Sequence, residues 1–300
     1  MIKNIYYLNE FAKLHKKQYV VELPIKVQSD NYPLILKERY KEYESLLKDF
    51  LVSHDGEAIW EDVKDDLTYL YESFIDVIEG GSYENFRKCL EEIDEKRQLI
   101  KSMKKTLDKV DYYRFCSYST KLTEPKHFYH CPITRRGMNT RFGIADIPLW
   151  YLGCSKDVCM YEAAGCNGSL AVFRQKDSTE PINIIDLTQK GCCNKDEDLF
   201  PLGICYLFWW ILACCYCFLD NDNHEQTSTI PQMFAKYIRE NYKDISGIRY
   251  YTVRNSQLNP NEDTYVNVAL FTREYNAEGY DICLCEKFEM VRCEQNVKTK

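Results

Sequence analysis

The sequence predicts an α+β protein: an N-terminal helical bundle over residues 1–110, followed over residues 111–300 by a domain with a mixed, mainly antiparallel sheet and helices. Two observations lead to this class. Before residue 110, apolar residues recur at three- and four-residue spacing, which is typical of amphipathic helices. After it, short aromatic and β-branched runs alternate with helical segments, which indicates strands and helices sharing one domain.

Three amphipathic helices are expected in the N-terminal region, over residues 34–51, about 60–77 and about 82–110. Asp55-Gly56 marks a turn after the first helix, and Gly80-Gly81 ends the second. Ser82 can cap the third helix through its hydroxyl.

The C-terminal region contains eight strand-like segments, at residues 128–131, 149–153, 169–173, 182–186, 248–253, 265–271, 280–286 and 288–293. Helices are expected between them, at about 155–165, 203–217 and 230–242.

Charge and cysteine content limit the partners. A net charge of -7 argues against nucleic acid as a direct partner, so an anionic ligand must be met by a few placed arginines. The 15 cysteines predict no metal site, because Cys214 and Cys217 have CxxC spacing without a second matching pair. The first residues lack an apolar signal core, which with the odd cysteine count predicts a cytoplasmic protein with reduced thiols.

One apolar run is long enough to cross a membrane. Leu199–Leu219 holds 21 residues without a charge. Pro201, Gly203 and the absence of Lys or Arg close after the run favour a buried segment of a soluble protein instead. No membrane association is therefore expected.

The segment from Phe128 to Glu162 concentrates residues that could carry chemistry. Arg141 offers a fork of donors for phosphate oxygens, and Tyr151 offers an aromatic face for a planar base. Glu162 offers a carboxylate that can stabilise a sugar cation. Together they suit an NAD-cleaving pocket.

From about Asp111 to the C-terminus the chain resembles the RES-domain family, which is named for its characteristic Arg, Glu and Ser. The matching pieces occur in the family's order: Tyr113-Arg114, His130-x-Pro132 with Arg136, Arg141-Phe142 through Pro148, Tyr151-Leu152-Gly153, Glu162, Pro231-Gln232 and Gly247 to Thr252. The HxP element, including His130, is expected to be structural. The N-terminal helical region lies outside the resemblance.

The resemblance implies an ADP-ribosyltransferase-like fold and an enzyme that consumes NAD+ as its substrate, without a further cofactor. Such an enzyme cleaves the nicotinamide–ribose bond as a glycohydrolase or phosphorylase, and acts as a toxin or antiphage effector. The resemblance also implies a helix-turn-helix antitoxin as partner, and it leaves the oligomeric state open.

The same resemblance assigns site residues. Arg141, Glu162 and Thr252 are expected to be catalytic, and Tyr113, Arg114, Arg141 and Tyr151 to bind NAD+. Thr252 stands where the family has serine and keeps the hydroxyl while adding a methyl group.

Two other functions stay open from the sequence. One is transfer of ADP-ribose onto a macromolecule, which differs only in what replaces nicotinamide. The other is a degenerate domain that binds a nucleotide or a partner without catalysis. Thr252 favours the degenerate domain, whereas the retention of Arg141, Tyr151 and Glu162 opposes it.

Overall fold

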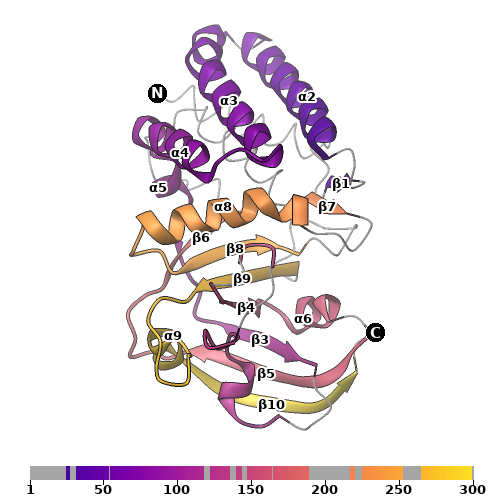
Figure 1. Cartoon of the computed structure of the whole chain (residues 1–300), viewed down its shortest axis with the longest axis vertical. Helices are drawn as coiled ribbons and strands as arrows, with labels where there is room; N and C mark the ends of the chain where they lie inside the picture. Colours follow the sequence, from indigo (N-terminus) through magenta and orange to yellow (C-terminus); the bar gives the residue numbers. More distant parts are fainter. Residues whose placement is uncertain are drawn as a thin grey trace. The chain divides into compact units, whose positions relative to one another are not determined.

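The chain forms two compact units, seen here in a computed structural model. The described residues are 25–27, 32–53, 55–117, 122–135, 140–143, 147–163, 165–188, 217–219, 225–252 and 265–298. The N-terminal unit comprises Met1–Met103 with Cys192–Met233, and the sheet unit comprises Lys104–Gly191 with Phe234–Lys300 (Figure 1).

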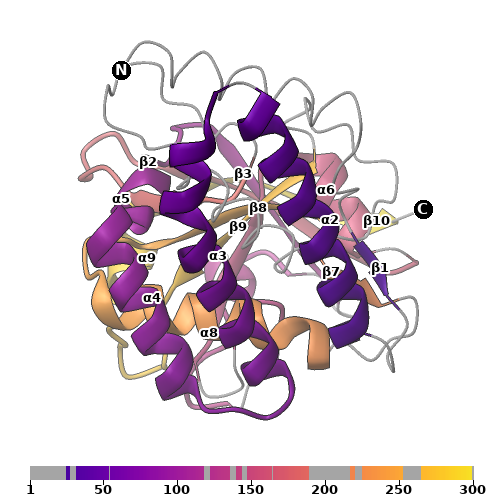
Figure 2. The same ribbon diagram turned by 90° about the horizontal axis from the view of Figure 1, so that it is seen from above.

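Helices make up most of the described N-terminal unit. They are α2 (Tyr32–Ser53), α3 (Glu57–Ile78), α4 (Tyr83–Arg97) and α5 (Leu99–Met103). Helix α3 packs against both α2 and α4, as Figure 2 shows. A short parallel pair, β1 (Ile25–Val27) with β7 (Cys217–Leu219), belongs to the same unit.

The first two predicted helices are confirmed. The residues expected to end the second helix and to begin the third also act as predicted. Gly80 follows α3 at a φ of 98°, a left-handed conformation that glycine adopts without a steric penalty. The Ser82 hydroxyl accepts a hydrogen bond from the Asn85 amide at 3.3 Å, which caps α4.

The prediction of one helix from residue 82 to about 110 was wrong. Helix α4 ends at Arg97, and Gln98 follows at a φ of 53°. The Asp94 carboxylate accepts from the Ile100 amide at 2.6 Å, so a side chain takes a donor that a continuous helix would use. Residues Lys104–Thr106 then form strand β2 in the sheet unit.

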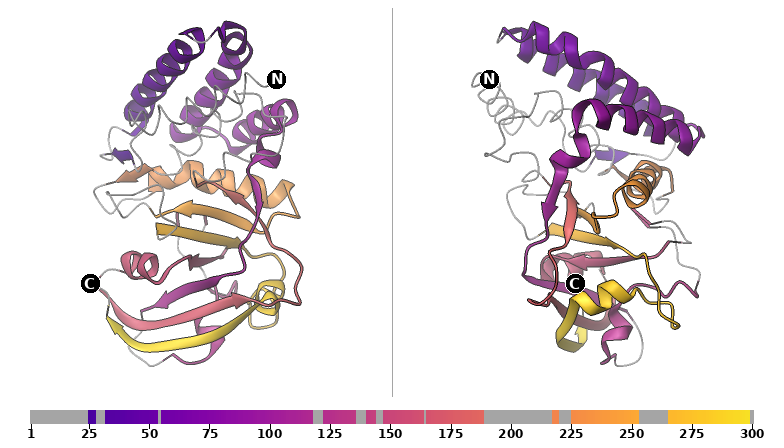
Figure 3. Two further views of the ribbon diagram at one scale, coloured as in Figure 1. Left: turned by 180° about the vertical axis from the view of Figure 1, so that it is seen from behind. Right: turned by 90° about the vertical axis from the view of Figure 1, so that its left-hand side faces the viewer.

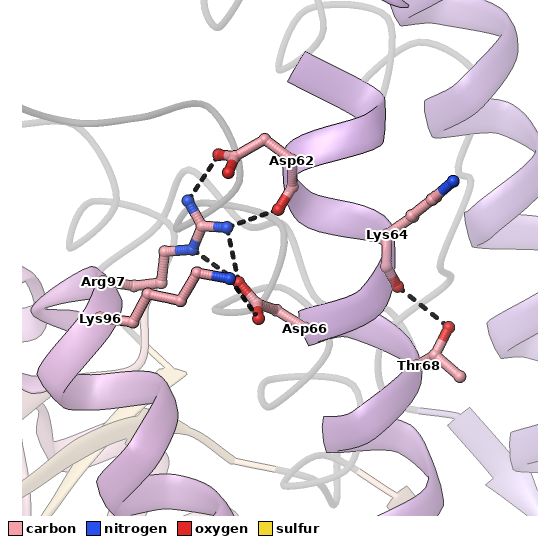
Figure 4. Close-up of polar contacts among 6 residues, drawn as sticks. All are labelled: Asp62, Lys64, Asp66, Thr68, Lys96 and Arg97. Atoms are coloured by element: carbon pink, nitrogen blue, oxygen red, sulfur yellow. Dashed lines mark hydrogen bonds and ion pairs between the residues drawn. The ribbon is translucent and has the colours of Figure 1, made fainter. Parts of the chain in front are cut away.

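An ion-pair cluster around the buried Arg97 joins α4 to α3 (Figure 4). Arg97 is only 6% exposed, and its guanidinium lies 2.6 Å from carboxylate oxygens of both Asp62 and Asp66. It also donates to the Asp62 carbonyl at 2.6 Å, and Lys96 adds a 2.8 Å contact to Asp66. The hydrogen bond from Arg97 lowers the pKa of Asp62 below its usual value. Arg97, which interrupts the apolar stripe of α4, therefore connects two helices.

Arg97→Lys is expected to lower the free energy of unfolding by about 1–2 kcal/mol, because an ammonium cannot reach both carboxylates and the Asp62 carbonyl from one position. Urea denaturation followed by circular dichroism measures this loss. Arg87→Lys is the matched control, since Arg87 lies on the same helix and pairs with Glu84 and Glu91 at the surface. Equal midpoints for both variants would show that the cluster adds no stability.

The sheet unit is built on eight strands, in the order β10-β5-β3-β4-β9-β8-β6-β2. Their bounds are β2 Lys104–Thr106, β3 Asp111–Cys116, β4 Leu149–Gly153, β5 Asn167–Gln175, β6 Asn183–Asp186, β8 Gly247–Tyr251, β9 Val266–Phe271 and β10 Phe288–Lys298. Only β6 and β8 run parallel among these described neighbours (Figure 3). The open sheet is mixed and mainly antiparallel, so the predicted α+β class is confirmed.

Short helices accompany this sheet. They are the 3-10 helix η2 (Pro125–Phe128), α6 (Lys156–Glu162), α9 (Ile282–Lys287) and α8 (Glu225–Asn241), of which Phe234–Asn241 belong to the sheet unit. The helices predicted at 155–165 and 230–242 correspond to α6 and α8. Of the helix predicted at 203–217, the structure describes only Cys217, which lies in strand β7.

Two predicted strands were wrong, and four of the described strands were missed. Residues 128–131 follow η2 without forming a strand, and Asp281 caps α9 inside the segment 280–286 by accepting from the Leu284 amide at 2.7 Å. Strands β1, β2, β3 and β7 were not predicted. The other six predicted strands are confirmed over their described residues.

Side chains along the central strands alternate between a core face of the sheet and a second face. Trp150 and Leu152 of β4 lie in the same buried cluster as Val268 and Leu270 of β9. The Trp150 indole donates to the Phe128 carbonyl at 2.9 Å. Because neighbouring side chains of a strand point to opposite faces, the residues between these belong to the other face. That second face carries Tyr151 and Asn267 of the candidate site, whereas Arg114 of β3 has the same strand parity as Tyr112 and Cys116 of the buried cluster.

Candidate active site

Strands β3 and β4 meet at one register pair, Tyr113 with Gly153. Beyond it, the half-buried Arg114 reaches across from β3, and its Nη1 donates to the Tyr151 carbonyl at 3.1 Å. The Arg114 Nε is buried without a hydrogen-bond partner, and within the described part of the chain no carboxylate pairs with this guanidinium. A buried donor of this kind is costly unless a ligand satisfies it.

Gly153 lets helix α6 lie close to the strands. A Cβ at this position would come within 2.6 Å of the Val158 side chain and 2.7 Å of the Cys159 sulfur. The Ser155 hydroxyl caps α6 by accepting from the Val158 amide at 3.1 Å. Cys159 also donates from its thiol to the Tyr113 carbonyl at 3.0 Å. These contacts fix α6, whose last residue is Glu162.

The Glu162 carboxylate is held by two donors from the neighbouring strands. Thr252, which follows β8 and is fully buried, donates from its hydroxyl to Glu162 Oε1. Asn267 of β9, which is 5% exposed, donates from Nδ2 to the same oxygen at 3.0 Å. The Thr252 amide also donates to the Tyr265 carbonyl at 2.8 Å. One oxygen of Glu162 is therefore fixed, and neither of these bonds uses Oε2.

Arg141 lies in a tight turn formed by residues 140–143. The Thr140 amide donates to the Gly143 carbonyl at 2.8 Å, and the Gly143 amide donates to Thr140 Oγ1 at 3.1 Å. The Tyr151 hydroxyl lies 2.6 Å from Thr140 Oγ1 and accepts from the Phe142 amide at 3.2 Å. The turn thus contacts β4 on both sides of Arg141.

Tyr250 of β8 lies among the charged groups of the site. Its pKa is raised well above the usual value, first because the side chain is buried. Four neighbours add smaller charge effects on this pKa: Tyr151 and Glu162, which raise it, and Arg141 and Arg114, which lower it. The four residues therefore lie within electrostatic range of one hydroxyl.

The structure brings together most of the residues expected at the site. Five of them gather on the sheet unit: Arg114, Arg141, Tyr151, Glu162 and Thr252. Tyr113 contacts Cys159 through its backbone carbonyl. Their roles stay predictions.

Two other motif residues were named from the sequence. Arg136 lies outside the described residues. The ring of His130 contacts the Cys131 carbonyl at 2.7 Å and accepts from the Asp281 amide at 2.8 Å, so its structural role is confirmed.

Sequence reasoning missed three residues of the site: Thr140, Tyr250 and Asn267. Tyr250 lies inside the Gly247-to-Thr252 motif, where it had no role. Asn267 had a visible signal, since it is the one polar residue of the strand sequence VNVALF. A buried amide in an apolar strand needs a polar partner, and here the partner is Glu162.

Gly153→Ala is expected to lower the free energy of unfolding by about 1–2 kcal/mol, because the methyl group overlaps Val158 and Cys159. It should also displace α6 and so weaken any activity that depends on Glu162. A thermal melt and an activity assay measure the two effects. Adding Val158→Ala removes the nearest obstacle and should restore part of the activity; no restoration would contradict the packing argument.

No protein-family model and no curated protein matches the chain. A solved structure that it is similar to is the M. tuberculosis MbcT–MbcA toxin–antitoxin complex. The similarity covers 66% of this chain and 89% of that chain, at 12% sequence identity and a TM-score of 0.36.

Neither a membrane-spanning helix nor a cluster of metal ligands occurs among the described residues. Within the described ranges, no helix combines the length and apolar character needed to cross a membrane. The run Leu199–Leu219 lies outside those ranges up to residue 216, so its burial stays a prediction. Among the same residues, no three His, Cys, Asp or Glu side chains gather in a way that could hold a metal ion.

Proposed function

We propose that this protein is an NAD+-consuming enzyme that cleaves the nicotinamide–ribose bond. The observation that carries the proposal is a carboxylate, Glu162, fixed by two hydrogen bonds and lying within electrostatic range of the Tyr250 hydroxyl. A half-buried arginine, Arg114, lies within range of the same hydroxyl and has no carboxylate partner in the described part of the chain. Arg141 and Tyr250 lie within electrostatic range of the same groups. The ordered RES-type motifs of the sequence support the same reading.

The carboxylate suits the bond that breaks. When nicotinamide leaves NAD+, positive charge develops on the ribose ring, and a fixed negative charge nearby stabilises that transition state. Holding Glu162 by Thr252 and Asn267 means that it need not reorganise during the reaction. In a water-excluded site this effect is larger than in solution.

The arginines suit the rest of the substrate. NAD+ carries a diphosphate, and guanidinium groups bind phosphate oxygens through paired donors. Arg114 has a buried Nε without a partner, a donor that a bound phosphate could satisfy. In a chain with a net charge of -7, these placed positive charges would do what an overall basic surface does elsewhere.

The biological role follows from the resemblance and belongs to the proposal. Loss of NAD+ in the cytoplasm would arrest growth, so the protein would act as a toxin or antiphage effector. An antitoxin of the helix-turn-helix type would hold it inactive. The second product depends on the acceptor: hydrolysis adds water and gives ADP-ribose, whereas phosphorolysis adds phosphate and gives ADP-ribose phosphate.

Incubating the purified chain with NAD+, with and without inorganic phosphate, tests the proposal. Mass spectrometry should detect nicotinamide together with ADP-ribose, or with ADP-ribose phosphate when phosphate is present. Release of no nicotinamide under any condition would contradict the proposal. Nicotinamide release that requires an added protein, with ADP-ribose bound to that protein, would identify a transferase instead.

A further inference from the structure

We infer that the Tyr151 hydroxyl is a positioning group, which holds the turn of residues 140–143 and thereby places Arg141. This role differs from stacking on a base, for which only the aromatic ring is needed. Its consequence for catalysis rests on the proposed function, whereas the positioning itself does not.

The hydroxyl contacts the turn on both sides of Arg141. It lies 2.6 Å from Thr140 Oγ1 and accepts a hydrogen bond from the Phe142 amide at 3.2 Å. Thr140 Oγ1 donates to the Gly143 carbonyl at 3.3 Å and accepts from the Gly143 amide. With the Thr140 proton used in this way, the Tyr151 hydroxyl donates to Thr140 and accepts from Phe142.

The turn is compact, because hydrogen bonds join its first and last residues and its atoms pack closely together. A Cβ at Gly143 would lie 2.7 Å from Thr140 Oγ1, so the hydroxyl of Thr140 occupies the space that a side chain would need. Thr140 and Gly143 also bond through their backbones at 2.8 Å. Such a unit keeps its internal shape, and its place in the site depends on what ties it to the sheet.

Tyr151 is a firm point of attachment because the sheet fixes its backbone. It pairs with Ala269 in the antiparallel register of β4 and β9. Its carbonyl accepts from Arg114 Nη1 at 3.1 Å, while its hydroxyl binds the turn that carries Arg141. Tyr151 therefore contacts Arg114 through its carbonyl, and the turn that carries Arg141 through its hydroxyl.

The hydroxyl stays protonated at neutral pH, as this donor role requires. Burial raises the pKa of Tyr151, against smaller opposing effects of the Thr140 hydrogen bond and of the Arg141 and Arg114 charges. The phenol is thus an O–H donor to Thr140 throughout the physiological range.

Tyr151→Phe tests this inference because it removes the hydroxyl and keeps the ring. By NMR hydrogen exchange, the Phe142 amide should exchange about tenfold faster in the variant, since its acceptor is lost. Tyr112→Phe is the matched control: it also removes one hydroxyl hydrogen bond, to the Asp108 carbonyl at 2.7 Å, from a residue in the core cluster. In this control the exchange of Phe142 should stay at the parent rate.

A second pair of variants approaches the same contact from the turn. Thr140→Ser keeps the hydroxyl and should retain parent exchange at Phe142, whereas Thr140→Val should accelerate it. Unchanged exchange of Phe142 in Tyr151→Phe would overturn the inference, whether or not the protein consumes NAD+. Failure of the parent to consume NAD+ would contradict only the proposed function.

The consequence for catalysis is measured separately, through KM and kcat/KM. Tyr151→Phe should raise the KM for NAD+ about tenfold, and adding it to Arg141→Ala should cause no further loss of kcat/KM. A merely structural tyrosine would lower thermal stability without this dependence on Arg141. Additive losses in the double variant would overturn the claim that Tyr151 acts through Arg141.

Discussion

Glu162→Gln is expected to reduce NAD+ consumption by about 10²–10³-fold while leaving the fold intact. The substitution removes the negative charge and almost no volume. Loss of one preorganised electrostatic group of this kind typically raises the barrier by about 2.7–4 kcal/mol.

The structure explains why the fold should survive. Thr252 and Asn267 both donate to Oε1, and the amide oxygen of glutamine can accept the same two bonds. The neutral side chain then occupies the place of the charged one. Because these two bonds are kept, a loss of activity in a folded variant is expected to report the charge.

Mass spectrometric assay of nicotinamide release measures the effect, and circular dichroism checks the fold. Glu289→Gln, on the exposed side of strand β10, is the matched control and should behave as the parent. Near-parent turnover by a folded Glu162→Gln protein would remove Glu162 from the mechanism.

Local patterns were sufficient for elements whose own residues determine them. The alternation of β4 and the stripes of α2 and α3 placed these elements correctly, because apolar periodicity reports which face is buried. The stripe of α4 continued through Met103 and Leu107, but the backbone of Lys104–Thr106 pairs with β6, about eighty residues away. A tertiary pairing of this kind leaves no local signal.

The candidate site likewise combines residues that local patterns reveal with contacts that depend on the tertiary fold. Arg141, Glu162 and Tyr151 could be proposed because they lie in one segment with residue types suited to the chemistry. The hydrogen bond between Thr252 and Glu162 spans 90 residues and depends on the order of strands in the sheet, which spacing alone does not give. Asn267 could be suspected as a buried polar residue, but its partner could not be named.

Substitutions at Thr252 are expected to follow the order Ser ≥ Thr > Val in NAD+ turnover. Thr252→Ser keeps the hydroxyl that donates to Glu162 and removes only the methyl group. Thr252→Val keeps the shape but removes the hydroxyl that donates to Glu162 Oε1, while the Asn267 donor stays. A lost hydrogen bond of this kind costs about 1–3 kcal/mol, which corresponds to roughly 5- to 150-fold in rate.

The full burial of Thr252 favours an action through Glu162 over direct contact with the substrate. If that is its role, Thr252→Val should cost little once Glu162 is already glutamine, because the group that it holds no longer carries the charge. Equal turnover of the serine, threonine and valine proteins would make Thr252 a packing residue. Turnover that appears only in the serine protein would instead identify the natural chain as a degenerate domain, in which the added methyl group blocks a site that is otherwise assembled.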